Sequence, residues 1–107
     1  MKTAQILSLA RQFIVSGWCQ KNQAVNSRDV RVCYASSEAC KFCPIGAIAR
    51  AVFDLGLKES EYQYALVYLR KVLGVPTITS WNDDQDRTQA EVLSGFEKAI
   101  AKLEDLK

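Results

Sequence analysis

The stretch from Ser37 to Gly56, SEACKFCPIGAIARAVFDLG, constrains the fold more than any other part of the chain. Its apolar residues recur at helical spacing along the whole stretch, while Lys41 and Arg50 point away from the apolar face. So few polar positions indicate burial on more than one side. We therefore expect a central helix over residues 37–55, around which the rest of the chain packs.

Pro44 complicates this central helix. Ser36 or Ser37 can cap the start of the helix, and Gly56 suits the left-handed residue that follows its end. A proline inside a helix has no N–H to donate, and its ring clashes with the carbonyl four residues earlier. Either the helix kinks at Pro44, or a new helix begins with Pro44 as its first residue.

Three further helices are predicted from apolar stripes and capping residues. They cover residues 3–16, 60–73 and 88–105. Thr3 and Ser60 are the expected caps of the first two, and Thr88 with Glu91 has the spacing of a capping box. The segment TITSWNDDQDR before the last helix is expected to be a polar connection.

The segment between Gly17 and Ser36 has a different pattern. Asn, Ser and Asp occupy turn-like positions, and Val30, Val32 and Tyr34 alternate with other residues. A short β-hairpin and a mostly irregular wrap both fit. We predict a mainly α fold, a single domain over residues 1–107, built as a bundle of about four helices with an irregular or hairpin insert after the first helix.

Composition sets limits on compartment and partners. The 107 residues are 49% apolar and 24% charged, no apolar run has the length of a membrane span, and no secretion signal is recognised. We expect a soluble cytoplasmic protein whose four cysteines are reduced thiols. The net charge is only +2, and the basic residues are spread over every segment, which argues against a nucleic-acid-binding protein.

The cysteines are one candidate site. Cys40 and Cys43 have the spacing of a zinc knuckle, and Cys19 with Cys33 would complete a set of four thiolates. Cys19 and Cys33 are too far apart in sequence to form a second knuckle, and the chain has no histidine. We therefore predict buried or free thiols without metal, and keep zinc binding or thiol redox chemistry as the alternative.

A second candidate site is the turn of Trp81, Asn82 and Asp83 with the nearby Arg87. An amide, a carboxylate and a guanidinium beside an indole can bind a small polar ligand. The alternative is structural, with Trp81 anchoring the connection to the core. Without histidine, a Gly-rich phosphate loop or a nucleophile elbow, the sequence favours a protein without catalysis and without a cofactor.

We expect Trp18, Cys19 and Cys43 to lie close to the turn of residues 81–83. Tryptophans in polar connections need apolar surface to cover them, and a break at Pro44 would leave the Cys40 carbonyl without its helical donor. The Asn82 amide is the expected replacement donor. These segments form the predicted binding surface.

Several short motifs resemble those of a family of small uncharacterised proteins from actinobacteria, other bacteria and bacteriophages, catalogued as a domain of unknown function. The motifs are Gly17-Trp18-Cys19-Gln20, Glu38-Ala39 with Phe42-Cys43-x-x-Gly46-Ala47-Ile48, Trp81-Asn82-Asp83, and Arg87-Thr88-x-x-Glu91-Val92. The resemblance implies a bacterial or phage cytoplasmic protein and no particular activity. Cys33 and Cys40 lie outside the motifs, which counts against a family-wide zinc site of four thiols.

The function that the sequence favours is a protein-interaction or regulatory module, with an unidentified protein partner or a second copy of itself. The alternatives are a zinc- or redox-active cysteine module, and a small-ligand-binding protein or enzyme that uses the Trp81-Asn82-Asp83 turn and Arg87.

Overall fold

A computed structural model describes residues 2–105. Within them the elements are α1 (Lys2–Ser16), β1 (Ala24–Val25), β2 (Lys41–Phe42), α2 (Pro44–Leu55), α3 (Glu59–Leu73), α4 (Ile78–Asp83) and α5 (Gln89–Asp105). The prediction of a mainly α fold with an insert after the first helix is confirmed, and of the two forms left open for the insert, irregular or short hairpin, the structure has the hairpin pairing of β1 with β2.

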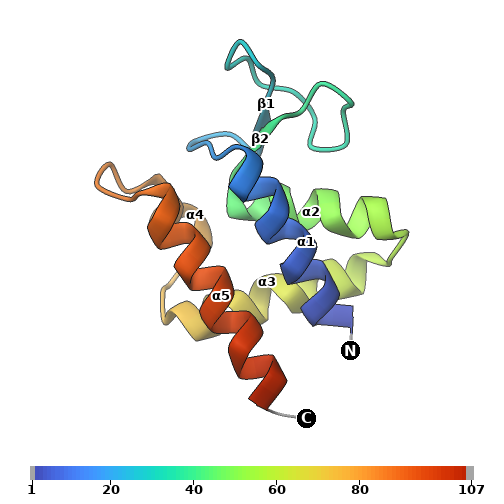
Figure 1. Cartoon of the computed structure of the whole chain (residues 1–107), viewed down its shortest axis with the longest axis vertical. Helices are drawn as coiled ribbons and strands as arrows, with labels where there is room; N and C mark the ends of the chain where they lie inside the picture. Colours follow the sequence, from blue (N-terminus) through green and yellow to red (C-terminus); the bar gives the residue numbers. More distant parts are fainter. Residues whose placement is uncertain (1, 106–107) are drawn as a thin grey trace.

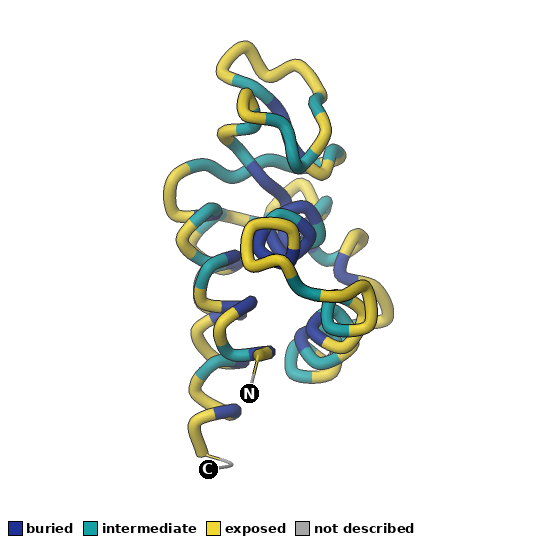
Figure 2. The backbone as a smooth tube through the Cα atoms, turned by 90° about the vertical axis from the view of Figure 1, so that its right-hand side faces the viewer, coloured by how far each residue is buried: buried dark blue, intermediate teal, exposed yellow. Residues whose placement is uncertain are grey.

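Helix α1 lies at the centre of the helical body. It packs against α2 and α5, and α3 in turn contacts both of these helices (Figure 1). The largest fully buried apolar side chains come from α1, α2, α3 and α5 and are Ile6, Leu7, Ile14, Ile48, Leu69, Val92 and Phe96. Figure 2 shows the buried positions on the inner sides of the helices, with exposed residues along their outer sides and over much of the insert.

Helix α2 begins at Pro44, so the prediction of a helix over residues 37–55 is wrong for its first part. Of the two arrangements that proline allows, the new helix is the one observed, because Pro44 stands at the first helical position, where no N–H is required. Cys43 is the cap in place of Ser36 or Ser37, and its Sγ accepts from the Gly46 N–H at 3.3 Å. Gly56 ends the helix with φ +67°, as predicted.

The other helices match the sequence pattern more closely. The capping box of Thr88 and Glu91 opens α5, with the Thr88 N–H 2.9 Å from the Glu91 carboxylate. Helix α3 begins at Glu59, one residue before the predicted start, and Lys58 takes the cap position predicted for Ser60. Part of the predicted polar connection is the short helix α4, which Thr77 caps by accepting the Ser80 N–H at 3.1 Å.

The insert over residues 17–43 projects from one end of the helical body (Figure 1). Its antiparallel pair of strands places Ala24 opposite Phe42 and Val25 opposite Lys41. The alternating segment around Val32 forms no strand of its own among the described residues and contributes one isolated bridge, from Arg31 to Val25.

Two packing contacts join this insert to α1 and α2. Phe42 is buried against Phe13 of α1, with ring centres 5.2 Å apart. Gly46, in the first turn of α2, lies so close to the segment before β1 that a side chain there would overlap the Gln23 carbonyl. Within residues 2–105, the helices lack the combination of length and apolarity that crossing a membrane requires.

Replacement of Gly46 by alanine tests this close approach. Alanine normally stabilises a helix interior by about 1 kcal/mol relative to glycine. At Gly46 the added methyl would collide with the backbone of Gln23, so we expect Gly46→Ala to lower the free energy of unfolding by about 2 kcal/mol or more.

Gly95→Ala is the matched control, because its methyl would meet side-chain atoms and no backbone: the end of the flexible Leu73 side chain at 2.8 Å and the edge of the Trp81 ring at 3.3 Å. We expect this control to change stability by less than about 1 kcal/mol. Urea denaturation of both variants measures the difference, and equal stabilities would contradict the close approach of α2 to Gln23.

Candidate functional site

The loop that follows α1 is joined to α4 through the side chain of Asn82. The Trp18 indole N–H donates to Asn82 Oδ1 at 2.8 Å, and Asn82 Nδ2 donates to the Cys19 carbonyl at 3.2 Å. Asn82 is only 1% exposed, so both ends of a buried amide are used in hydrogen bonds between two segments far apart in sequence. The expected proximity of Trp18 and Cys19 to the turn of residues 81–83 is observed.

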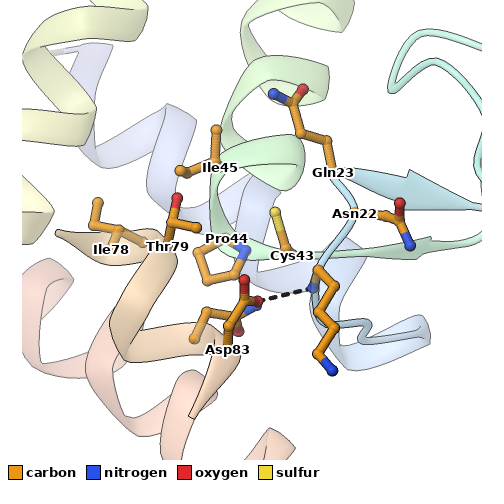
Figure 3. A pocket seen from close by; sticks show the side chains of 10 residues that line it. Asn22, Gln23, Cys43, Pro44, Ile45, Ile78, Thr79 and Asp83 are labelled. Carbon is orange, nitrogen blue, oxygen red and sulfur yellow. Dashed lines mark hydrogen bonds between the residues drawn. The ribbon is translucent and has the colours of Figure 1, made fainter.

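Two more residues of the loop bind the end of α4. The Gln20 amide donates to the carbonyls of Asn82 and Asp84, each at 2.8 Å. The Lys21 backbone N–H donates to Asp83 Oδ1 at 2.8 Å, the dashed line in Figure 3. A helix of six residues leaves most of its carbonyls without partners, and Gln20 donates to one of these, that of Asn82, and to the Asp84 carbonyl just beyond the helix.

The prediction that Asn82 donates to the Cys40 carbonyl is wrong. Asn82 donates to Cys19 instead, and the reason is the start of α2. Because that helix begins at Pro44, the proline breaks no helical hydrogen bond to Cys40, and no replacement donor is required.

Trp81 and Arg87 form a contact of their own beside this network. The Arg87 guanidinium carbon lies 4.6 Å from the centre of the Trp81 ring, and Arg87 Nε donates to the Trp81 carbonyl at 2.8 Å. Trp81 is half-buried and packs against the core. Both side chains therefore stabilise the connection between α4 and α5.

A small cleft of about 200 Å³ lies where the loop, the start of α2 and α4 meet. Figure 3 shows Cys43 and Pro44 between the loop residues Asn22 and Gln23 and the α4 residues Thr79 and Asp83. The residues that line the cleft are Lys21, Asn22, Gln23, Cys43, Pro44, Ile45, Ile78, Thr79, Asn82 and Asp83.

Three of the predicted binding residues, Cys43, Asn82 and Asp83, line this cleft. Trp18, Cys19, Trp81 and Arg87 lie outside its lining. Trp18 and Cys19 instead hydrogen-bond to Asn82, whereas Trp81 and Arg87 contact each other. A binding role for all seven stays a prediction. The sequence reasoning missed Lys21, Asn22, Gln23, Ile78 and Thr79, because neither an irregular loop nor a helix of six residues has a detectable period.

The four cysteines have different surroundings. Cys43 is buried and Cys19 half-buried, whereas Cys33 and Cys40 are exposed, and all four are free thiols. Among residues 2–105, no three histidine, cysteine or acidic side chains come together in a way that would hold a metal ion. The alternative zinc set of Cys19, Cys33, Cys40 and Cys43 is therefore not assembled.

Burial keeps two of these thiols protonated. Burial raises the pKa of Cys19 from 9.0 to about 12, and the neighbouring Cys43 and Asp83 add to the shift. Burial also raises the pKa of Cys43, although the hydrogen bond from the Gly46 N–H acts in the opposite direction. The thiolate is the reactive form, so neither cysteine is activated for nucleophilic chemistry near neutral pH.

Comparison with known proteins gives a family and no activity. Residues 1–102 match the sequence model of a family of unknown function (DUF6197). No curated protein and no solved structure matches the chain.

Removal of the Asn82 side chain tests the join between the loop and α4. Asn82→Ala leaves the Trp18 indole N–H and the Cys19 carbonyl without their partner, so we expect the free energy of unfolding to fall by about 2–3 kcal/mol. The neighbouring Asp83→Asn keeps an oxygen that can accept from Lys21, and should change stability by about 0.5 kcal/mol or less. Thermal unfolding of both variants measures this difference. An unchanged melting temperature for Asn82→Ala would show that the network contributes little to stability.

The reaction of the cysteines with an aromatic disulfide reagent tests their burial and pKa. At about pH 8, Cys33 and Cys40 should react quickly, whereas Cys19 and Cys43 should react only as fast as the protein opens. Because the folded pKa of Cys19 exceeds 9.0, its reaction should accelerate as the pH rises toward 12. Four equal rates in the native protein would contradict this assignment.

Proposed function

We propose that this chain, which belongs to the DUF6197 family of unknown function, is a non-catalytic interaction module that binds an apolar segment of a partner protein along α2. The observation that carries the proposal is a row of apolar side chains, Ile45, Ala49, Val52 and Phe53, at helical spacing on one side of α2. We call this side of α2, with the hollows that it lines, the α2 groove.

Two hollows make up the α2 groove. Ile45 lines the cleft beside α4, and the other three apolar residues of the row line a second hollow of about 360 Å³ near the end of α2. Gln23 lines both hollows, so they adjoin at this residue. Tyr34 from the insert and Leu57, Glu59 and Tyr62 from the region of α3 complete the lining of the second hollow.

Phe53 is the strongest indication of binding within the groove. Its side chain is 59% exposed, although it stands beside the buried Val52 and lines the same hollow as two tyrosines. Aromatic side chains are enriched in protein interfaces, where they supply a large apolar area at a small entropic cost. An exposed phenylalanine at the mouth of an aromatic hollow is suited to pack against an apolar side chain of a partner.

The charge of the second hollow indicates which residues the partner segment should carry. Glu59 is the charged residue in its lining. A partner segment that places a lysine or arginine beside its apolar anchor would pair with this carboxylate. We therefore assign the α2 groove to a segment in which an apolar residue is next to a basic one.

The site chemistry favours binding over catalysis. The sequence has no histidine, and Asp83 already accepts a backbone hydrogen bond from Lys21. The raised pKa values of Cys19 and Cys43 keep both thiols protonated at neutral pH. None of these groups is poised as a general base or a nucleophile.

Selection from a display library of random short peptides, followed by binding measurements on two variants, tests the groove. We expect selected peptides to combine an apolar with a basic residue, and Phe53→Ser to weaken their binding at least about tenfold. Tyr64→Ser is the matched control, because Tyr64 is exposed to a similar extent, 56%, and lines a different hollow on α3. Both variants should stay folded, since neither side chain is buried.

Fluorescence anisotropy gives the affinities, and amide shift changes in NMR spectra give the location. Shifts should cluster at Ala49, Val52 and Phe53. Peptides that bind Phe53→Ser as tightly as the unaltered protein, or that shift amides elsewhere, would contradict the proposal. Loss of the preference for basic residues in Glu59→Gln would support the assigned pairing.

A further inference from the structure

A third hollow, of about 510 Å³, lies on the insert. Its lining comes from the loop residues Lys21, Asn22 and Gln23 and from the segment Arg31, Val32, Cys33 and Tyr34. We call it the insert hollow. Its volume falls in the range of small-molecule sites, which is about 300–1,000 Å³.

The charges that line the insert hollow have one sign. Lys21 and Arg31 contribute two cations, and no carboxylate of residues 2–105 belongs to the lining. The basic residues that form ion pairs within residues 2–105 are Lys2, Arg11, Lys41, Arg50 and Arg87, which leaves both cations of the hollow outside these pairs.

Two acidic side chains on neighbouring segments, Asp83 and Asp29, have partners other than the Lys21 ammonium and the Arg31 guanidinium. Asp83 accepts from the Lys21 backbone and lines the cleft beside α4, and Asp29 pairs with Lys41 at 2.6 Å. A concave surface with two unneutralised cations concentrates anions.

Hydrogen bonds hold the backbone on both sides of the hollow. Lys21 has φ +69°, a left-handed conformation that residues other than glycine adopt uncommonly. Its N–H donates to Asp83, and the side chain of the preceding Gln20 donates to the carbonyls of Asn82 and Asp84. Strain of this kind persists only where surrounding contacts fix it, and it is concentrated at binding and active sites.

On the other side of the hollow, Arg31 forms an isolated antiparallel β-bridge with Val25 of β1 through its backbone. The Val32 N–H donates to the Ala24 carbonyl at 3.1 Å. The wall that carries Arg31 is therefore attached to the small sheet. The two cations approach the same hollow from different segments, each with its backbone hydrogen-bonded to the fold.

We propose that the insert hollow binds a small phosphate monoester that carries an aromatic group. The planar guanidinium of Arg31 matches two phosphate oxygens, Lys21 adds a point charge, and the amides of Asn22 and Gln23 supply further donors. Half-buried Val32 and Tyr34 provide an apolar wall against which a ring can pack. The insert hollow shares Lys21, Asn22 and Gln23 with the hollows of the α2 groove, but Phe53 and Glu59, on which the proposed peptide binding depends, lie outside its lining.

Calorimetric titration of the full chain with phenyl phosphate tests the proposal. We expect saturable binding, weaker binding of inorganic phosphate, and no binding of benzyl alcohol, which has the ring without the charge. Affinity should also fall below about pH 6, where the phosphate loses its second charge.

Three variants locate the site. Lys21→Asn removes the charge and places a residue that tolerates the left-handed conformation, and Arg31→Gln removes the other cation. Each should weaken phenyl phosphate binding at least about tenfold. Arg28→Gln is the control, because Arg28 is an exposed cation of the same insert that lies outside the lining of the hollow, and it should bind as the unaltered protein does.

Melting temperatures establish that the three variants are folded before binding is compared. Absence of saturable phenyl phosphate binding would overturn the site. Equal weakening by Arg28→Gln would also overturn it, because that result indicates attraction by overall charge, as for a polyanion such as RNA. Phe53→Ser should retain phenyl phosphate binding, so the result is separate from the test of the α2 groove.

Discussion

The docking of the loop after α1 against α4 depends on the buried side chain of Asn82. A two-stranded sheet is marginally stable alone, so residues 17–43 need tertiary contacts to hold one arrangement. Asn82, itself buried, supplies two of these contacts by accepting from Trp18 and donating to Cys19. A buried amide costs free energy unless its partners are all present, so this network favours a single docked geometry over displaced ones.

The same network explains how the hollows of the molecule arise. It fixes the loop of residues 20–23, which forms a wall of the cleft beside α4 and a wall of the insert hollow. Because the hydrogen-bonding capacity of Asn82 is used inside the protein, its role is positioning. The groups that remain available for ligands or partners lie elsewhere: the Lys21 side chain on the loop that the network holds, and, outside the network, the apolar row on α2 that ends at Phe53.

The sequence predicted the helices whose apolar period runs over several turns, α1, α3 and α5, and it predicted that Trp18 and Cys19 meet the turn of residues 81–83. It overextended α2, because buried strand residues such as Phe42 happen to continue the helical spacing up to Pro44. It missed α4, whose six residues are too few to show a period. The hollows could not be predicted, since they depend on backbone bonds such as that from Lys21 to Asp83.

Hydrogen exchange at the Trp18 indole nitrogen, followed by NMR, tests the central claim most directly. If Asn82 holds the loop against α4, the Trp18 Nε1 proton should exchange far more slowly than in an unfolded peptide, at a rate set by the opening of the fold. Exchange at the rate of a free indole, in a protein whose helices remain protected, would show that the loop is not held by Asn82 and would contradict this account.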